Sequence, residues 1–170
     1  DLNEELTEEG LLPINIGIGI NTGEAVVGNM GSDQRFDYSV LGDPVNLGAR
    51  LEGQSKSYGV ELVVSENTKQ GIDDDRLTWI LLDKLIVKGK KEPVNIYTVF
   101  DIPVYKHTVR DIEDAWDAYV KGEWDKSINI YSKITFSPLE DYSKIMVSRC
   151  KKMKQLNPSD WEGIWEATTK

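Results

Sequence analysis

The chain has very few of the side chains that build most metal centres and catalytic triads. It contains one cysteine, Cys150, and one histidine, His107, among 170 residues. A single cysteine excludes a disulfide within the chain, which is typical of a reducing compartment. We interpret Cys150 as a helix-packing residue, because no nucleophile motif surrounds it, and His107 as part of a polar linker. A histidine-based metal site or triad is therefore not expected.

Long apolar runs and excess positive charge are also missing. No apolar stretch approaches the roughly 20 residues that a membrane-spanning helix needs, and no signal peptide is visible. The net charge is −9, whereas a nucleic-acid-binding protein needs a basic face, so we expect no nucleic-acid partner. The chain begins at Asp1 and not at Met. We therefore expect a piece of a longer protein, and a membrane anchor before residue 1 stays open.

Apolar runs and turn residues divide the first part of the chain into strands and helices. The predicted strands are 13–21, 24–29, 37–41, 60–64, 79–85 and 95–100. The first two are expected to form a hairpin, and a polar loop is expected at 30–35. Helices are predicted at 44–58, where Gly59 provides a stop, and at 66–70. This mixture predicts an α+β fold with a ferredoxin-like sheet and packing helices.

The residues after Gly42 predict how the longer helix begins and which face it offers. Asp43 is a good helix N-cap, and Pro44 then falls at the first helical position, where its missing N–H costs nothing. Asn46 and Arg50 are four residues apart and share a face of the helix. A planar guanidinium near a helix start suits an anionic ligand such as phosphate. Spacing alone leaves open a solvated Arg50 and a locally capping Asn46.

The pattern changes after residue 102, which predicts one domain at 1–102 and a small all-α tail at 103–170. Apolar residues recur at helical spacing from Thr108 onward, and another helix is predicted at 141–156. The segment 122–133 (GEWDKSINIYSK) resembles the turn and second helix of a tetratricopeptide repeat. One repeat is too short for an independent solenoid. Its apolar face is expected to pack on the first domain, on another chain, or on the terminal segment 161–165 (WEGIW).

Four ordered segments resemble the second half of the catalytic domain of class III adenylate and guanylate cyclases. They are 16–32 (IGIGINTGEAVVGNMGS), 36–52 (FDYSVLGDPVNLGARLE), 58–65 (YGVELVVS) and 85–97 (LIVKGKKEPVNIY). Their order and spacing make the resemblance specific over roughly residues 12 to 101. Gly17, Gly19 and Gly23 do not fit the G-x-G-x-x-G spacing of a dinucleotide-binding fold, so a Rossmann fold is not expected.

The resemblance implies conversion of a nucleoside triphosphate into a 3′,5′-cyclic monophosphate and pyrophosphate. It implies that Asn46 orients the ribose and that Arg50 neutralises charge at the α-phosphate. A lysine of the last hairpin contacts the terminal phosphates in the family; Lys88 is the first candidate here and Lys90 the alternative. Ser39 matches the position that reads the base. Serine there resembles bacterial adenylate cyclases, so we expect ATP as the substrate, and bicarbonate sensitivity is a hypothesis.

The resemblance also implies two divalent ions, Mg²⁺ or Mn²⁺, held by two aspartates in the first half of the domain. This chain starts after that half, so no metal ligand is assigned within it. Asp101 follows the last strand and is rejected as a metal ligand, and the run 73–75 (DDD) is interpreted as a solvated turn. The 170 residues alone are therefore expected to be inactive and to expose sheet edges.

Active sites of the family lie between two catalytic domains, which implies a homodimer. This chain would supply the asparagine and the arginine to such a site. The resemblance favours a cytoplasmic domain in intracellular signalling, and a membrane-anchored bacterial receptor-type protein is one form it could take. Two other functions stay open: a cyclase-like regulatory module that binds nucleotide without turnover, and an interaction protein whose helical tail binds a protein partner.

Overall fold

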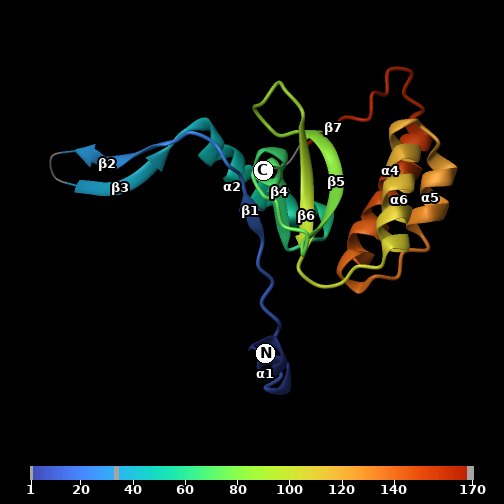
Figure 1. The fold of residues 1–170 in the computed structure, drawn as a ribbon, viewed down its shortest axis with the longest axis horizontal. Coiled ribbons are helices and arrows are strands. Elements are labelled where there is room, and N and C mark those ends of the chain that lie inside the picture. Colours follow the sequence, from blue (N-terminus) through green and yellow to red (C-terminus); the bar gives the residue numbers. More distant parts are fainter. Residues whose placement is uncertain (1, 33–34, 168–170) are drawn as a thin grey trace.

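The computed structural model describes residues 2–32 and 35–167 and combines a sheet with packing helices (Figure 1). The strands are β1 (Ile18–Ile20), β2 (Val26–Ser32), β3 (Arg35–Leu41), β4 (Leu62–Ser65), β5 (Thr78–Ile86), β6 (Val94–Phe100) and β7 (Trp165–Glu166). The helices are α1 (Leu2–Glu8), α2 (Asp43–Tyr58), α3 (Glu66–Gln70), α4 (Lys106–Val120), α5 (Trp124–Tyr131) and α6 (Glu140–Leu156), with a 3₁₀ turn at Ser137–Leu139. The predicted α+β class is confirmed.

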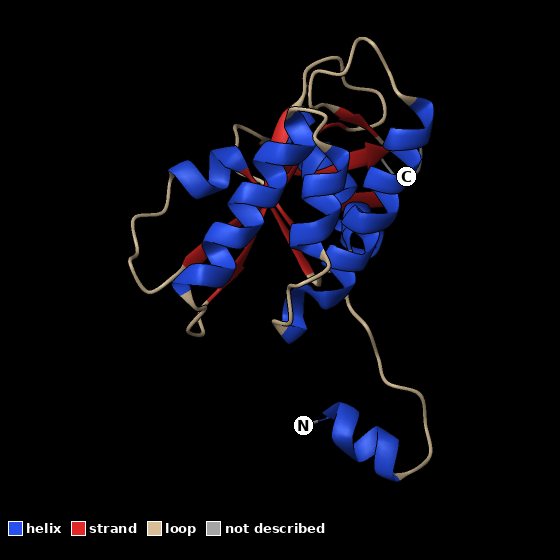
Figure 2. Cartoon of the chain, turned by 90° about the vertical axis from the view of Figure 1, so that its right-hand side faces the viewer, coloured by secondary structure: helices blue, strands red, loops and turns tan. Residues whose placement is uncertain are grey.

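Within the described residues, one sheet has the strand order β1-β4-β6-β5-β7. Its central strands β4, β6 and β5 are antiparallel, whereas the outer strands β1 and β7 run parallel to their neighbours. Helix α2 packs against β1 and β4. The tail helices α4, α5 and α6 gather at the β5 side of the sheet, as the two views together show (Figures 1 and 2).

The predicted hairpin between 13–21 and 24–29 is wrong. Only Ile18–Ile20 forms a strand there, and this strand pairs in parallel with β4. Strand β2 pairs instead with β3, in a two-stranded ribbon that projects from the rest of the chain (Figure 1). The ribbon also replaces most of the loop expected at 30–35, of which residues 33–34 lie outside the described residues. Glycines alternate with isoleucines in the first run; the bare glycine face packs against α2, whereas the edge of the strand pairs with β4.

Gly19 sets how closely α2 approaches β1. A Cβ atom at Gly19 would lie well inside contact distance of backbone atoms of Gly48 and Glu52 on the helix. Backbone atoms cannot rotate away as the end of a side chain can, so any larger residue would push the helix off the strand. The glycine spacing of this segment therefore serves helix packing.

We expect Gly19→Ala to destabilise the chain by about 1–3 kcal/mol, the usual cost of overpacking a core. Urea unfolding followed by far-UV circular dichroism measures this difference. Gly28→Ala is the matched control, because a Cβ at Gly28 in β2 would have no neighbour within 4 Å. Equal stability of the two variants would contradict the close approach.

The start of α2 differs from the expectation. Gly42 and not Asp43 is the N-cap residue, and no side chain caps the helix there. Asp43 is the first helical residue, and its carboxylate forms an ion pair with Lys90 in the β5–β6 loop. Pro44 lies in the first turn, but as the second helical residue and not the first, and Gly59 ends the helix in the left-handed conformation with φ 62°. Asp43 therefore pairs with Lys90 and does not cap the helix. The local sequence does not reveal this long-range partner.

The helical tail and the sheet share one hydrophobic core. Leu82 and Leu85 of β5 are fully buried together with Tyr119 of α4 and Met146 of α6. Strand β7 returns to the sheet and pairs with β5, and the indole nitrogen of Trp161 donates to the carbonyl of Tyr119 at 3.0 Å. The tail thus packs on the first part of the chain and on its own terminal segment. The domain boundary at 102/103 and the likeness to a tetratricopeptide repeat stay predictions.

Strand β1 leaves an open edge of the sheet. Ile16, Ile18 and Ile20 in and before it are 67, 46 and 41 % exposed, in agreement with the expected exposed edges. Helix α1 stands apart from the sheet (Figure 2), and the side chain of Asn3 bonds to both backbone groups of Ile14. Among the described residues, no helix has the length and apolar character needed to cross a membrane.

Candidate functional site

The start of α2 and the loop between β5 and β6 form the candidate site. Asn46 is exposed on the first turn of α2, and Arg50, one turn later, is half-buried. The loop folds over this part of the helix because Lys90 forms its ion pair with Asp43. A second contact, between Gly89 and Arg50, holds the loop on the next turn. The structure therefore brings two positions from the segment 36–52 together with the basic loop, although they lie some forty residues apart in the sequence.

Gly89 makes room for the guanidinium of Arg50. It has φ 79°, a conformation that favours glycine, and a Cβ atom there would lie 3.4 Å from Nη2 of Arg50. The other terminal nitrogen, Nη1, is shielded from solvent and has no hydrogen-bond acceptor among the described residues. A buried donor without an acceptor costs about 1–3 kcal/mol, and more if it is charged. The guanidinium of Arg50 thus lies against Gly89, and its Nη1 has no acceptor among the described residues.

Asn21 fixes the chain beside the first turn of α2. Its side-chain nitrogen donates to the carbonyl of Pro44 at 2.9 Å, whereas its oxygen Oδ1 is buried without a partner in the described part of the chain. Sequence reasoning missed Asn21 and Gly89. Asn21 lies two residues before Gly23, and Gly89 is itself a loop glycine. The presence of a glycine was the only signal for these two positions in the sequence.

The two lysine candidates differ in their surroundings. The side chain of Lys90 is 24 % exposed and paired with Asp43, whose own side chain is 70 % exposed. Lys88 is exposed, and none of the described residues forms an ion pair with it. Lys90 is therefore tied to the helix, whereas Lys88 is available to a ligand. Their contacts with phosphate stay predictions.

Ser39 is not brought into the same cluster. It lies in β3 opposite Gly28 of β2, within the projecting ribbon, and is half-buried. No hydrogen bond joins it to the other four candidates in the part of the chain that the structure describes. Its role in reading the base stays a prediction.

The described residues do not fit a metal centre. No group of three or more His, Cys, Asp or Glu side chains among them is close enough to hold an ion. In the acidic run 73–75, Arg76 binds Asp74 at 2.6 Å and lowers the pKa of that carboxyl through this hydrogen bond. The side chain of Arg76 is 87 % exposed and that of Asp74 is 27 % exposed, so Asp74 is only partly solvated. The expected Mg²⁺ or Mn²⁺ therefore finds no ligand set in residues 2–32 and 35–167.

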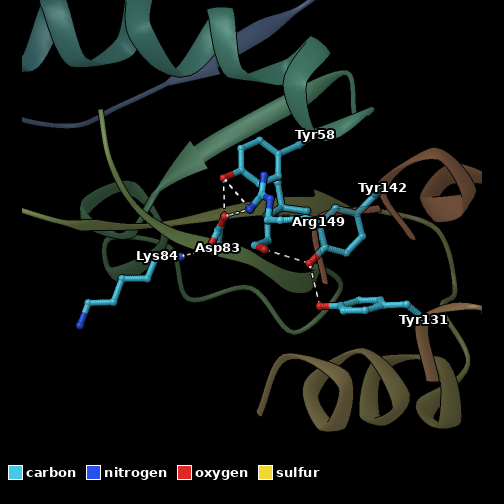
Figure 3. A network of polar contacts seen from close by, with 7 residues as sticks. Tyr58, Asp83, Lys84, Tyr131, Tyr142 and Arg149 are labelled. Atoms are coloured by element: carbon cyan, nitrogen blue, oxygen red, sulfur yellow. Dashed lines mark hydrogen bonds and ion pairs between the residues drawn. The ribbon is translucent and has the colours of Figure 1, made fainter. Parts of the chain in front are cut away.

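A buried polar network joins the tail to α2 and β5, and sequence reasoning missed it (Figure 3). Arg149 of α6 pairs with Asp83 of β5, and their side chains are 8 % and 0 % exposed. The hydroxyl of Tyr58 at the end of α2 donates to the same carboxylate, and the backbone N–H of Lys84 donates to its other oxygen at 2.8 Å. The only signal was Asp83 within the largely apolar stretch 78–86, because Arg149 lies among three lysines in 142–153 and does not stand out.

Two tyrosines extend the network into the tail (Figure 3). The hydroxyl of Tyr142 donates to the carbonyl of Leu82 at 2.9 Å. Since that proton is used, the hydroxyl of Tyr131, 3.2 Å away, is the donor to Tyr142. Burial raises the pKa of both tyrosines, so both remain protonated donors at neutral pH.

In the ion pair between Asp83 and Arg149, each buried charge depends on the other. Burial raises the pKa of Asp83, and Arg149 and Tyr58 offset only part of this effect. Burial also raises the pKa of Tyr58, and the neighbouring carboxylate raises it further. A buried carboxylate without its cation would be costly, because few water molecules could solvate it. The network therefore locks α6 onto β5 and the end of α2.

The chain was compared with known proteins. Residues 1–101 match the family described as the adenylate and guanylate cyclase catalytic domain. The terminal-differentiation-specific adenylate cyclase of Dictyostelium discoideum is 30% identical over 146 residues, which cover 81% of this chain and 7% of that protein. An adenylate cyclase of Anabaena cylindrica is 39% identical over 92 residues, 53% of this chain and 18% of that protein.

A solved structure adds to these likenesses. The adenylyl cyclase CyaB of P. aeruginosa is similar with a TM-score of 0.51 and 33% sequence identity, over 62% of this chain and 52% of that chain. The chain thus spans less than a fifth of the two curated relatives and about half of the solved structure.

Proposed function

Because the chain belongs to the adenylate and guanylate cyclase catalytic domain family, we propose that it is part of an adenylate cyclase that forms 3′,5′-cyclic AMP and pyrophosphate from ATP. The observation that carries this proposal is the guanidinium of Arg50, held against Gly89 with one nitrogen lacking an acceptor. An oxygen of a triphosphate is a suitable acceptor, because guanidinium groups bind phosphate strongly. The choice of ATP rests on relatives named as adenylate cyclases.

Each residue of the site has a separate role in the reaction of the nucleotide. The 3′ oxygen of the ribose attacks the α-phosphorus in line, so that one phosphorus–oxygen bond forms while the bond to pyrophosphate breaks. Asn46, exposed on the same helix face, orients the ribose. Arg50 neutralises the charge that develops at the α-phosphate and on the leaving pyrophosphate. Such preorganised donors are among the largest contributions to catalysis.

The lysines take different roles in this proposal. Lys88 is exposed without an ion pair to the described residues and contacts the terminal phosphates. Lys90 is bound to Asp43 and holds the loop on α2, so that Gly89 keeps its place beside Arg50. Ser39 in β3 reads the base with a hydroxyl, which can donate or accept.

The remaining parts of the site lie outside the described residues. We propose that the aspartates for Mg²⁺ or Mn²⁺ belong to the first half of the catalytic domain, which this chain does not contain. A homodimer then completes each site between two domains, with the asparagine and arginine from one copy and the aspartates from the other. The 170 residues alone would bind nucleotide weakly and form no product.

The test is an assay of the parent protein that contains the complete catalytic domain. ATP and GTP are each supplied with Mg²⁺ and with Mn²⁺, and both cyclic nucleotides are quantified. We expect cyclic AMP from ATP and little cyclic GMP from GTP. Cyclic GMP as the main product would overturn the substrate, and nucleotide binding without any product would favour a regulatory module. The isolated 170-residue chain serves as the inactive reference.

A further inference from the structure

A cavity of about 400 Å³ lies where α2, α6 and the C-terminal segment around β7 meet. This volume lies within the range of small-molecule sites, about 300–1,000 Å³. Gln54 and Ser57 line it from α2, Ser148, Arg149 and Lys152 from α6, and Trp165 from β7. None of its lining residues is acidic. None of the candidate site residues lines the cavity, and Gln54, its first lining residue on α2, lies one turn after Arg50.

Gln54 is the clearest sign that this cavity takes a ligand. Its side chain is only 4 % exposed, yet its amide forms no hydrogen bond with any described residue. The amide atoms of Gln54 are not among the fully shielded polar atoms without a partner in the described residues, so solvent reaches them from the cavity. The amide lines the cavity, so a molecule in the cavity can bond to it. An amide N–H₂ offers two donors and its oxygen an acceptor.

Cationic groups stand on the opposite wall. Arg149 lies with its guanidinium carbon 4.3 Å from the centre of the Trp165 ring, and the Lys152 ammonium is 5.9 Å from the same ring. The hydrogen bonds of Arg149 to Asp83 and Tyr58 both leave from Nη1, whereas a guanidinium has five N–H donors in all. The carboxylate of Asp83 neutralises the charge of Arg149. Lys152 has no ion pair with a described residue and adds a positive charge at the mouth.

From this arrangement we propose that the cavity between α2 and α6 binds a small oxyanion, a molecule with a carboxylate or phosphate group. The amide of Gln54, the hydroxyls of Ser57 and Ser148 and the ammonium of Lys152 supply its donors, and the indole of Trp165 forms an apolar wall. Donors without competing carboxylates match an acceptor-only group. The ligand bridges the tail and the catalytic part of the chain.

An anion bound in the cavity would contact α2, the helix that carries Arg50. Gln54 follows Arg50 by four residues, one turn along α2. The likeness to the Dictyostelium protein covers 81% of the chain, more than residues 1–101 contain, so it extends into the tail. The binding itself does not depend on the function proposed above, and the test therefore measures binding and not turnover.

The test is calorimetric titration of the 170-residue chain with inorganic phosphate and, separately, with acetate, at an ionic strength held constant with chloride. Gln54→Leu and Lys152→Gln remove donors from the cavity, and neither breaks a hydrogen bond or ion pair within the described residues. Each is expected to weaken binding about tenfold or more, because hydrogen bonds to charged groups are worth about 1.5–3 kcal/mol. Lys151→Gln is the matched control, an exposed neighbour on α6 that does not line the cavity.

Saturable binding that both donor variants weaken and Lys151→Gln preserves would support the site. Tighter binding of phosphate would assign a phosphate ligand, and tighter binding of acetate a carboxylate. Absence of saturable binding by both anions would overturn the proposal, as would an equal loss in Lys151→Gln, which indicates general charge attraction. Far-UV circular dichroism of each variant establishes that it is folded as the wild type is.

Discussion

Replacing Arg50 with alanine in the parent enzyme is expected to lower kcat about 10²–10³-fold, the usual loss when one preorganised donor to a developing charge is removed. The guanidinium is positioned by Gly89, and its Nη1 lacks an acceptor among the described residues. Since it acts on charge that develops during the reaction, KM for ATP should change much less than kcat. Steady-state kinetics of cyclic AMP formation measure both.

Two further variants separate catalysis from folding. Arg50→Lys keeps the charge but loses the planar pair of donors, so it should recover only part of kcat. Lys56→Ala removes an exposed charge near the end of the same helix and should leave kcat unchanged. If Arg50→Ala retained wild-type kcat, the arginine would not act on the transition state.

Arg149→Met is expected to destabilise the chain by about 3–5 kcal/mol, because it leaves the carboxylate of Asp83 buried without a cation. Adding Asp83→Asn should restore most of the loss. The asparagine oxygen can accept from the N–H of Lys84, its NH₂ group can donate to the hydroxyl of Tyr58, and no buried charge remains. Equilibrium unfolding in urea of the two single variants and the double variant gives the coupling energy.

Arg76→Met provides the comparison with an exposed ion pair. Arg76 and Asp74 lie at the surface, where water solvates either partner alone, so their separation should change stability little. A similarly small effect of Arg149→Met would show that water reaches Asp83 in the folded chain. The tail would then be held on the sheet by its apolar contacts, the Tyr142 hydrogen bond and the pairing of β7 with β5.

Local signals predicted most of the elements but not how the first strands pair. Gly59 ends α2 as expected, and Pro44 lies in its first turn. The run 13–21 reads as a strand by its isoleucines, and its alternate glycines admit α2 onto its face, but no local pattern indicates that its edge pairs with β4. Close approach of a helix depends on tertiary packing, which no local pattern specifies.

The candidate site was predicted in part. The helix face with Asn46 and Arg50 follows from spacing, because residues four apart share a face. The loop that meets this face depends on the Asp43–Lys90 pair, which joins residues far apart in the sequence. Asp83 could have been noticed as an acidic residue in a largely apolar stretch, but only the fold shows that it meets Arg149.

The tail is integrated with the sheet, and this changes how its function can be tested. Its residues Tyr119 and Met146 are buried in the same core as Leu82 and Leu85 of β5. Deleting 103–170 would expose that core and remove the cation from Asp83. Point variants on the cavity or at Arg149 therefore give clearer answers than truncation about what the tail does.

The two ends of the five-stranded sheet differ, and this limits how copies of the chain can join by strand addition. At one end, β7 pairs with Leu85 and Ile86 of β5, and Tyr142 of the tail donates to the carbonyl of Leu82 on the same strand. At the other end, β1 has no second strand partner among the described residues and lies beside exposed isoleucines. Two copies could pair through their β1 edges, but the covered ends would then face outward. Growth by this sheet would stop at a pair and would not continue into a fibre.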